Sequence, residues 1–166
     1  MCIRDSLWEA GSGHGMLACG YRAIDALRLE KGYRVWGADI TPEDSPDQAG
    51  LGFAVKPDKD VDFLGRDALL RAREGAPERR LACLALADPS AVCLGQEPVR
   101  VNGKVAGRVT SGGYGFAVGT SIAYAYVPAA ASEVGTGVEV EVFGEWVAAE
   151  VAAEPLWDPR GERIRA

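Results

Sequence analysis

Residues that could do chemistry are thinly spread along this chain. Gly11-Ser12-Gly13-His14-Gly15 is rich in glycine, but it has neither the Gly-x-Gly-x-x-Gly spacing of a dinucleotide-binding turn nor the Lys-Ser/Thr of a phosphate-binding loop. The sequence has no Gly-x-Ser-x-Gly nucleophile elbow, and His14 is its only histidine, so no catalytic triad is indicated. We therefore interpret residues 11–15 as a flexible loop and assign no catalytic residue.

Aromatic and basic residues are the remaining candidates for a binding site. Tyr33, Trp36 and Trp157 stand beside polar residues, although single aromatics of this kind are more often part of a core. The segment 110–115, Thr-Ser-Gly-Gly-Tyr-Gly, has glycines that permit close backbone approach, and its composition favours a turn between strands. Three arginines close the chain, where charges are usually just solvated: Arg160, Arg163 and Arg165.

The balance of charge excludes some partners. Lys and Arg number 18 and Asp and Glu 24, and the resulting net charge of -6 argues against a surface that grips nucleic acid. A small anionic ligand stays compatible, because one arginine can pair with a carboxylate whatever the total charge. No apolar run approaches the roughly 20 residues that span a bilayer, and no secretory signal follows Met1. We predict no membrane partner and a cytoplasmic location.

The four cysteines do not have the spacing of a metal site. Cys2, Cys19, Cys83 and Cys93 form no Cys-x-x-Cys pair, and none is placed to form a metal loop with His14. We predict no bound metal and four free, mostly buried thiols in a reducing compartment.

The first half of the chain mixes helical and extended patterns. Apolar residues at helical spacing, followed by Gly32, predict a helix over 22–31 that ends at that glycine, and residues 64–74 predict a second, amphipathic helix. Thr41-Pro42-Glu43-Asp44 and the capping-box pattern Ser45-Pro46-Asp47-Gln48 each predict a short helical turn. We expect a loop over 7–20, extended chain over 33–38 and a strand over 52–56.

After residue 80 the pattern becomes that of an antiparallel sheet. Asn102-Gly103, between two alternating runs, predicts a tight hairpin, and Gly144-Glu145 predicts another. Further strands are expected over 81–87, 107–111, 121–127, 138–143 and 146–151. Short strands joined by turn residues favour a small barrel or a sandwich. The polar stretch 74–80 suggests a domain boundary, which divides the chain into 1–78 and 79–166.

Several stretches occur in the same order as in one known family. They are Leu7–Gly11, Gly20–Tyr33, Trp36–Asp44, Ala49–Phe53, the "FxGRxAL" match Phe63–Leu70, the "GxVTSG" match Gly107–Gly115, Ser121–Val127 and Glu154–Pro159. The chain resembles the C-terminal part of the folate-binding domain of glycine-cleavage T-proteins (aminomethyltransferases). The resemblance implies an α+β fold: the C-terminal part of that folate-binding domain, followed by a small antiparallel β-barrel.

One position separates two branches of the family. T-proteins carry an arginine just before the aspartate that aligns with Asp25, whereas this chain has Ile24. Together with Glu30-Lys31-Gly32-Tyr33, this is similar to the folate domain fused to dimethylglycine and sarcosine dehydrogenases. A folate contact from an arginine at position 24 is therefore not expected here.

The resemblance implies a role in folate-dependent one-carbon transfer. Its cofactor is tetrahydrofolate, FAD belongs only to an upstream domain, and the reacting partner is a small iminium derived from an N-methylamine. The family's catalytic aspartate lies in a segment upstream of the matching residues, so we expect this chain to be a fragment that is incomplete and inactive alone. The alternative is a non-catalytic β-barrel module that docks to, or stabilises, a flavin-dependent amine dehydrogenase.

The resemblance also names candidate cofactor-binding residues. Tyr33 matches an aromatic residue that the family places at the folate, and a flat pterin stacks well on an aromatic face. Trp36 and Tyr114 are further candidates for the same lining. Arg163 and Arg165 fall where the family's basic end approaches the glutamyl tail, whose carboxylate a guanidinium can pair with. We expect structural roles for Arg28 and Glu30, and an exposed apolar patch near the helix 22–31.

Overall fold

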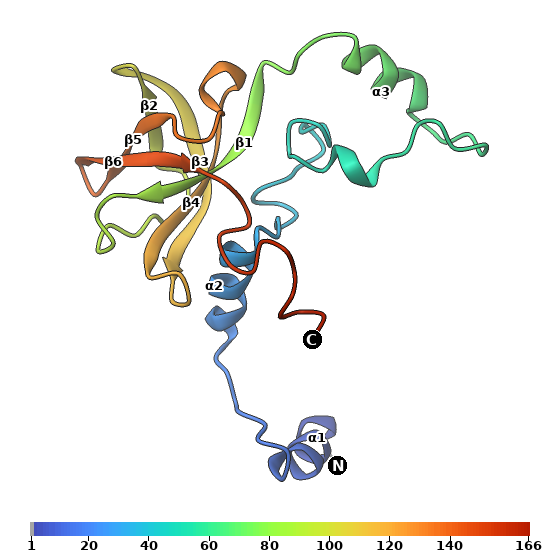
Figure 1. Ribbon diagram of the computed structural model, residues 1–166, viewed down its shortest axis with the longest axis vertical. Helices are drawn as coiled ribbons and strands as arrows, with labels where there is room; N and C mark the ends of the chain where they lie inside the picture. Colours follow the sequence, from blue (N-terminus) through green and yellow to red (C-terminus); the bar gives the residue numbers. More distant parts are fainter. Residues whose placement is uncertain (1) are drawn as a thin grey trace.

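A computed structural model describes residues 2–166 of the chain (Figure 1). Its helices are α1 (Ile3–Ser12), α2 (Tyr21–Lys31) and α3 (Arg66–Arg73), with short 3₁₀ turns at Gly52–Ala54 and Ala129–Ala131. Its strands are β1 (Arg79–Leu86), β2 (Pro98–Val101), β3 (Lys104–Gly115), β4 (Thr120–Pro128), β5 (Gly137–Val142) and β6 (Glu145–Ala152). In Figure 1 the helix α2 lies against the barrel, while α1 and α3 stand away from it.

The six strands form a closed antiparallel barrel in the order β1-β4-β3-β2-β5-β6. Long pairings between β1 and β4 and between β3 and β4 make up one side, and β6 returns to β1 to close the sheet. Closure leaves no long unpaired edge for another chain to join. Of the two architectures that the strand pattern favoured, the structure therefore shows the barrel, and the predicted α+β fold with an antiparallel barrel is confirmed.

Both predicted hairpins are present. Asn102 (φ 50°) and Gly103 (φ 76°) connect β2 to β3 with positive φ at both central residues, as a type I′ turn requires. The second hairpin lies one residue earlier than predicted, because its central residues are Phe143 (φ 51°) and Gly144 (φ 90°) and Glu145 already begins β6.

The barrel strands alternate between two separate cores. Inward side chains such as Leu84 on β1 and Val127 on β4 fill the barrel. Outward side chains of the same strands, such as Ile122 and Tyr124, pack with Leu29 of α2. Since α2 covers the outer face, β1 and β4 are buried on both sides, as their nearly unbroken apolar sequence requires.

The predicted helix over 22–31 is confirmed as α2. Gly32 ends it in the left-handed region (φ 75°), and the backbone N–H of Tyr33 donates to the carbonyl of Arg28 (2.9 Å). The predicted patch near this helix is also present, since Tyr21, Ile24 and Leu27 are each more than 60% exposed.

The predicted caps form single turns. Ser45 and Gln48 exchange hydrogen bonds in the capping-box manner, with the N–H of Ser45 donating to Oε1 of Gln48 (3.0 Å) and the N–H of Gln48 donating to Oγ of Ser45 (3.2 Å). Thr41 and Asp44 make a similar closed turn. The helix predicted over 64–74 is α3, slightly shorter than expected.

Three expectations about local structure were wrong in the first half of the chain. Residues 7–12 of the loop expected over 7–20 belong to α1, because helix formers such as Leu7, Glu9 and Ala10 continue the helix to Ser12, where Gly13 caps it. The expected strand over 52–56 is a 3₁₀ turn closed by bonds from Ala54 to Leu51 and from Val55 to Gly52. Of the extended chain expected over 33–38, Gly37 and Ala38 lie instead in a hydrogen-bonded turn, and Trp36 forms only an isolated bridge with Ile40.

The segment 110–115 is also not the turn that its composition favoured. It is the second half of β3, paired with β4 from Ser111 to Gly115. Its glycines do serve close approach: a Cβ on Gly112 would lie 2.6 Å from Cβ of Cys93, and one on Gly113 would lie 2.9 Å from Leu29. The prediction that these glycines allow close backbone approach is therefore confirmed, whereas the prediction that they form a turn between strands is wrong.

The thiols are free but not mostly buried. Cys2 and Cys19 are exposed, while Cys83 and Cys93 are buried. Burial raises the pKa of both Cys83 and Cys93 to about 12, which keeps these thiols protonated and unreactive near neutral pH.

This difference predicts selective labelling. Ellman's reagent at about pH 8 is expected to modify the two exposed thiols in the folded protein and all four in denaturant, because the thiolate is the nucleophile. The double variant Cys2→Ser, Cys19→Ser should stay unlabelled while folded. Rapid labelling of that variant would contradict the buried positions of Cys83 and Cys93.

Candidate functional site

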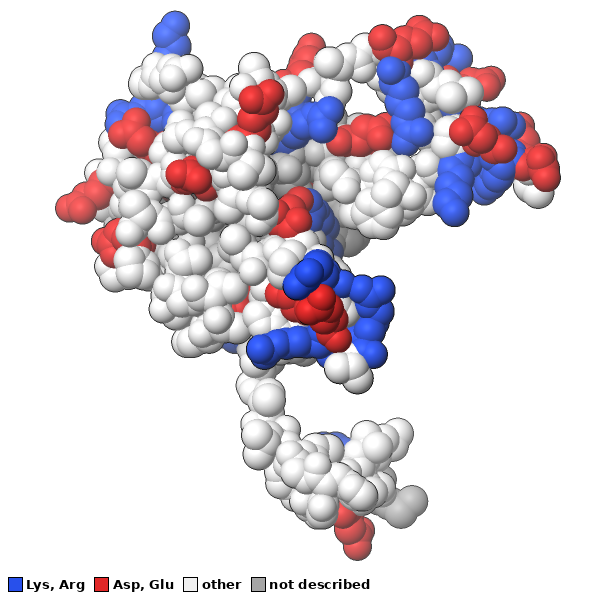
Figure 2. All heavy atoms as spheres, viewed as in Figure 1, with Lys and Arg blue, Asp and Glu red and all other residues white. Residues whose placement is uncertain are grey.

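Two hollows meet at Tyr33, between the end of α2 and the chain that follows β6. The apolar hollow, about 360 Å³, is lined by Ile24, Leu27, Arg28, Glu30, Lys31, Tyr33, Ala117, Trp157 and Ile164. The mixed hollow, about 580 Å³, is lined by residues of 31–34, 40, 50–53, 154–155 and 159–161. Tyr33 lines both hollows and is 59% exposed. Figure 2 shows basic and acidic side chains clustered around the C-terminal segment, while charged side chains are more scattered over the barrel.

The C-terminal segment 153–166 is fastened to α2 through Asp158. Lys31 Nζ donates to the carbonyl of Asp158 (2.6 Å) and pairs with its carboxylate (3.3 Å), and it lies 5.4 Å from the ring centre of Trp157. The carboxylate also accepts from the backbone N–H groups of residues 162–164. Desolvation opposes ionisation, but these N–H donors and Lys31 together lower the pKa of Asp158.

Arg34 forms the wall of the mixed hollow. Its guanidinium pairs with Glu154 and donates to the carbonyls of Gly32 and of Ala49 (3.2 Å). It also lies 5.2 Å from the ring centre of Tyr124. Desolvation opposes its charge, but hydrogen bonding and attraction to Glu154 raise the pKa of Arg34. The ion pair between Arg34 and Glu154 therefore joins the loop after α2 to the chain after β6.

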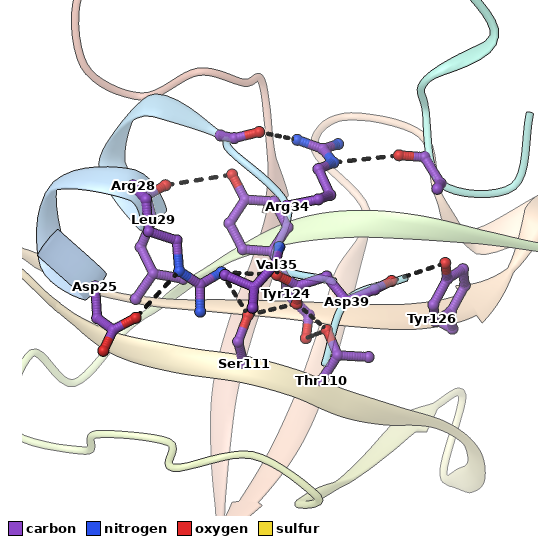
Figure 3. A network of polar contacts seen from close by, with 12 residues as sticks. Asp25, Arg28, Leu29, Arg34, Val35, Asp39, Thr110, Ser111, Tyr124 and Tyr126 are labelled. Carbon is purple, nitrogen blue, oxygen red and sulfur yellow. Dashed lines mark hydrogen bonds and ion pairs between the residues drawn. The ribbon is translucent and has the colours of Figure 1, made fainter. Parts of the chain in front are cut away.

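Asp39 is the centre of a buried polar network (Figure 3). The side chain is 1% exposed and accepts hydrogen bonds from Nη1 of Arg28 (2.7 Å), Oγ1 of Thr110 (2.6 Å) and Oγ of Ser111. It also accepts from the N–H of Val35 (3.0 Å). These donors come from α2, β3 and the turn after α2, so one carboxylate fixes all three segments relative to one another.

Arg28 and Glu30 have the structural roles that the sequence predicted. Arg28 reaches Asp39 and Ser111, and also lies 3.7 Å from Asp25 one turn earlier. Glu30 is 3% exposed, and its carboxylate accepts from the N–H groups of Ala117 and Val118 in the hairpin between β3 and β4. Both side chains anchor α2 to the barrel.

The predicted binding residues are not all brought together. Trp36 is 70% exposed in the turn after α2 and lines neither hollow. Tyr114 lines a third hollow, and its ring packs edge-on against Phe116, with ring centres 5.1 Å apart. Of the five candidates, only Tyr33 lines the apolar and mixed hollows.

The two predicted arginines, Arg163 and Arg165, line neither of these hollows. They are the sequence neighbours of Ile164, which lines the apolar hollow. The guanidinium of Arg165 donates to the carbonyls of Gly161 (3.0 Å) and Arg160, within its own segment. Arg163 has its backbone N–H held by Asp158 (3.2 Å).

Other residues at the hollows were not singled out as ligand contacts. Ile24, Phe53 and Arg160 line the hollows, although the sequence suggested only a solvated terminal charge for Arg160. A signal for the last of them is present in Asp158-Pro159-Arg160-Gly161, a turn-forming sequence that folds the segment back toward α2.

Comparison with protein families accounts for most of the chain. A model described as "GCVT N-terminal domain" matches residues 2–59, and one described as "Glycine cleavage T-protein C-terminal barrel domain" matches residues 79–158. The chain belongs to the glycine cleavage T-protein family. The predicted resemblance to this family is thus confirmed, and the second model covers the closed barrel.

Similarity to individual proteins is consistent with this family assignment. The chain is 44% identical over 163 residues to 4-methylaminobutanoate oxidase (formaldehyde-forming) of Paenarthrobacter nicotinovorans. The aligned region covers 98% of this chain and 20% of that relative. It is 41% identical over 156 residues to mitochondrial dimethylglycine dehydrogenase of Homo sapiens, covering 94% and 18% respectively. The chain therefore spans about a fifth of the length of these two relatives.

A solved structure shows the same fold. The glycine cleavage system aminomethyltransferase T from Bartonella henselae matches with a TM-score of 0.87 at 30% identity, over 95% of this chain and 44% of that one. This one match spans both the helical segment and the barrel of the present chain, which the two family models match separately. Among the helices within residues 2–166, none is long and apolar enough to cross a bilayer.

Proposed function

We propose that this chain forms part of the tetrahydrofolate-binding surface of an enzyme that removes one-carbon units from small N-methylated amino acids. The relatives' names support the substrate class, since 4-methylaminobutanoate and dimethylglycine are both such compounds. Tetrahydrofolate, when bound, accepts the one-carbon unit of an iminium, and FAD chemistry belongs to another part of the parent enzyme. We propose residues 1–78 and 79–166 as the two structural units of this chain.

The position of Tyr33 carries the proposal. Tetrahydrofolate joins a flat pterin to a benzoyl ring and an anionic glutamate, so its site needs aromatic and apolar surface next to cationic groups. Tyr33 stands where the apolar hollow, with Ile24 and Trp157, meets the mixed hollow, with Arg160. The residues present therefore fit the cofactor's chemistry.

Different side chains would contact different parts of the cofactor. We propose that the exposed ring of Tyr33 stacks on the pterin or benzoyl ring and that the apolar hollow excludes water from it. Arg160 and the predicted Arg163 and Arg165 would pair with the glutamate carboxylates. Because Ile24 replaces the T-protein arginine, the tail depends on these C-terminal arginines. Trp36 and Tyr114 lie outside both hollows, so these hollows do not support their predicted contacts.

Tyr33 provides the test of this function. Replacing Tyr33 by Ala is expected to weaken tetrahydrofolate binding about 10- to 100-fold, because the stacking surface is lost, whereas Tyr33→Phe should bind nearly as well as the original chain. Calorimetric titration of the purified chain measures both.

Tyr21→Ala is the matched control. Tyr21 is 84% exposed at the start of α2 and lines neither hollow, so this variant should leave affinity unchanged. Equal affinity for Tyr33→Ala and the original chain would exclude Tyr33 as the platform.

The alternative is a module that docks to, or stabilises, a flavin-dependent amine dehydrogenase without binding folate. The apolar side chains exposed on α1 and α2, among them Leu7, Tyr21 and Leu27, favour such a contact surface. Absence of tetrahydrofolate binding by the folded chain would favour this reading. The cytoplasmic location stays a prediction, since the human relative is named as mitochondrial.

A further inference from the structure

A third hollow lies on the opposite side of α2 from the apolar hollow. The α2–β3 hollow, about 560 Å³, is lined by Arg22, Asp25, Ala26, Arg28, Leu29, Val35, Ala38, Val92, Leu94, Thr110, Ser111, Gly112, Gly113, Tyr114 and Phe116. At 3.6 residues per turn, Asp25 and Leu29 project from the face of α2 opposite to Ile24 and Lys31. Arg28 lines both hollows, whereas Tyr33 and the C-terminal arginines proposed for folate do not line the α2–β3 hollow.

Arg28 presents a fixed guanidinium with unused donors in this hollow. Its side chain is 13% exposed, and Nη1 is held by Asp39 (2.7 Å) and by Ser111 (3.0 Å). Neither Nε nor Nη2 donates a hydrogen bond to any group within residues 2–166, and Nε is buried. Nη2 can therefore donate to an acceptor of a ligand, from a guanidinium that Asp39 and Ser111 already hold in place.

Asp25 offers the opposite charge beside that guanidinium. Its carboxylate lies 3.7 Å from Nε of Arg28, too far for a hydrogen bond, and its side chain is 54% exposed (Figure 3). Arg22 adds a second cation to the lining, while the charge of Asp39 is already used inside the network. A ligand with only a negative charge would be repelled by Asp25, and a ligand with only a positive charge would be repelled by Arg22 and Arg28. A ligand that carries both charges satisfies both sides.

Aromatic rings complete the α2–β3 hollow. Tyr114 and Phe116 pack edge-to-face at its rim, with an interplanar angle of 79°. A methylated ammonium group is attracted to aromatic faces and needs less solvation than a primary one. The rings therefore favour an ammonium group that carries methyl substituents.

We propose that the α2–β3 hollow binds a small zwitterionic amino acid with a methylated ammonium group. The ligand carboxylate accepts from Nη2 of Arg28 and from Arg22, and the ammonium lies between Asp25 and Tyr114. The ligand class rests on the proposed function, whereas the site itself lies apart from the proposed folate contacts and requires no folate.

The test is an NMR titration of the whole chain with N,N-dimethylglycine in the absence of folate. Backbone amides of Ser111, Gly112, Gly113 and Tyr114 should shift with a Kd of about 1–10 mM, as expected for so small a ligand. Acetate and dimethylamine each supply one of the two charges, and each should bind at least about 10-fold more weakly. No shifts at about 50 mM dimethylglycine, or equal shifts with acetate, would overturn the proposal.

Variants separate the two charges. Asp25→Asn should weaken dimethylglycine binding about 5- to 10-fold without weakening acetate binding, because only the ammonium loses its partner. Asp5→Asn, the same change on the exposed surface of α1, should have no effect. Arg22→Gln provides a second test that leaves the Arg28 network intact, and it should weaken both dimethylglycine and acetate. Unchanged dimethylglycine binding in both Asp25→Asn and Arg22→Gln would refute the site.

Discussion

Asp39→Ala is expected to lower the free energy of unfolding by about 3–5 kcal/mol, the largest effect of any single substitution considered for this chain. The carboxylate of Asp39 is 1% exposed and accepts from Arg28, Thr110 and Ser111. Removing it leaves the guanidinium of Arg28, 13% exposed, with only the more distant Asp25 as a counter-charge. It also leaves the hydroxyl of Ser111 without its acceptor, whereas Thr110 can still donate to the carbonyl of Tyr124 (3.2 Å). Urea unfolding followed by circular dichroism measures the loss.

Asp25→Ala is the matched control for this substitution. Asp25 pairs with the same arginine, but at 3.7 Å and with its side chain 54% exposed, so its removal should cost less than about 1 kcal/mol. If the two variants unfolded at the same urea concentration, the buried network would not contribute as its geometry implies. The comparison separates the buried, hydrogen-bonded network from an exposed pair, because residue type and arginine partner are shared.

Leu29→Ala is expected to cost about 2–5 kcal/mol and to loosen α2 from the barrel. Leu29 is the one fully buried apolar side chain of α2, and it packs with Ile122 and Tyr124 on the outer face of β4. The lost contacts cannot be replaced locally, since the barrel strands beneath are held by their own pairing. Thermal and urea unfolding report the change in stability.

Leu27→Ala makes the same chemical change two residues away. Leu27 is 63% exposed on the side of α2 that lines the apolar hollow, so its removal should alter stability by no more than about 0.5 kcal/mol. A loss for Leu27→Ala as large as that for Leu29→Ala would mean that α2 is seated differently on the barrel.

The two stability predictions bear on the proposed folate surface. Tyr33 follows the glycine that ends α2, and its N–H donates to the carbonyl of Arg28. Asp39 holds the other end of the same loop through Val35 and Arg28. The position of the Tyr33 ring therefore depends on α2 staying docked and on the turn staying closed, although neither Leu29 nor Asp39 needs to touch a ligand.

Local sequence patterns were enough to predict features whose hydrogen bonds close within a few residues. The turn at Asn102-Gly103, the cap at Gly32 and the reciprocal bonds of Ser45 and Gln48 all belong to this group. Alternation of apolar residues likewise predicted strands after residue 80, because one side of each strand must face a core. The motifs in family order predicted the T-protein fold.

Local composition misled where distant contacts decide the conformation. Residues 110–115 contain three glycines and look like a turn, yet they continue β3 because β4 supplies a partner and Cys93 and Leu29 occupy the space that side chains would fill. The strand expected over 52–56 had no partner strand and became a 3₁₀ turn. Strand identity is set by pairing as much as by residue type.

The sequence by itself determined the barrel, the helix that covers it and the kinds of residue available for binding. Only the tertiary structure decided which of those residues meet. Asp39 bonds to Ser111 across 72 positions and Lys31 to Asp158 across 127, and such contacts leave no local pattern to read. The hollows exist because α2, the turn at Asp39 and the segment after β6 are drawn together by these long-range bonds. For that reason Tyr33 lines two hollows, whereas Trp36, three residues away, lines neither.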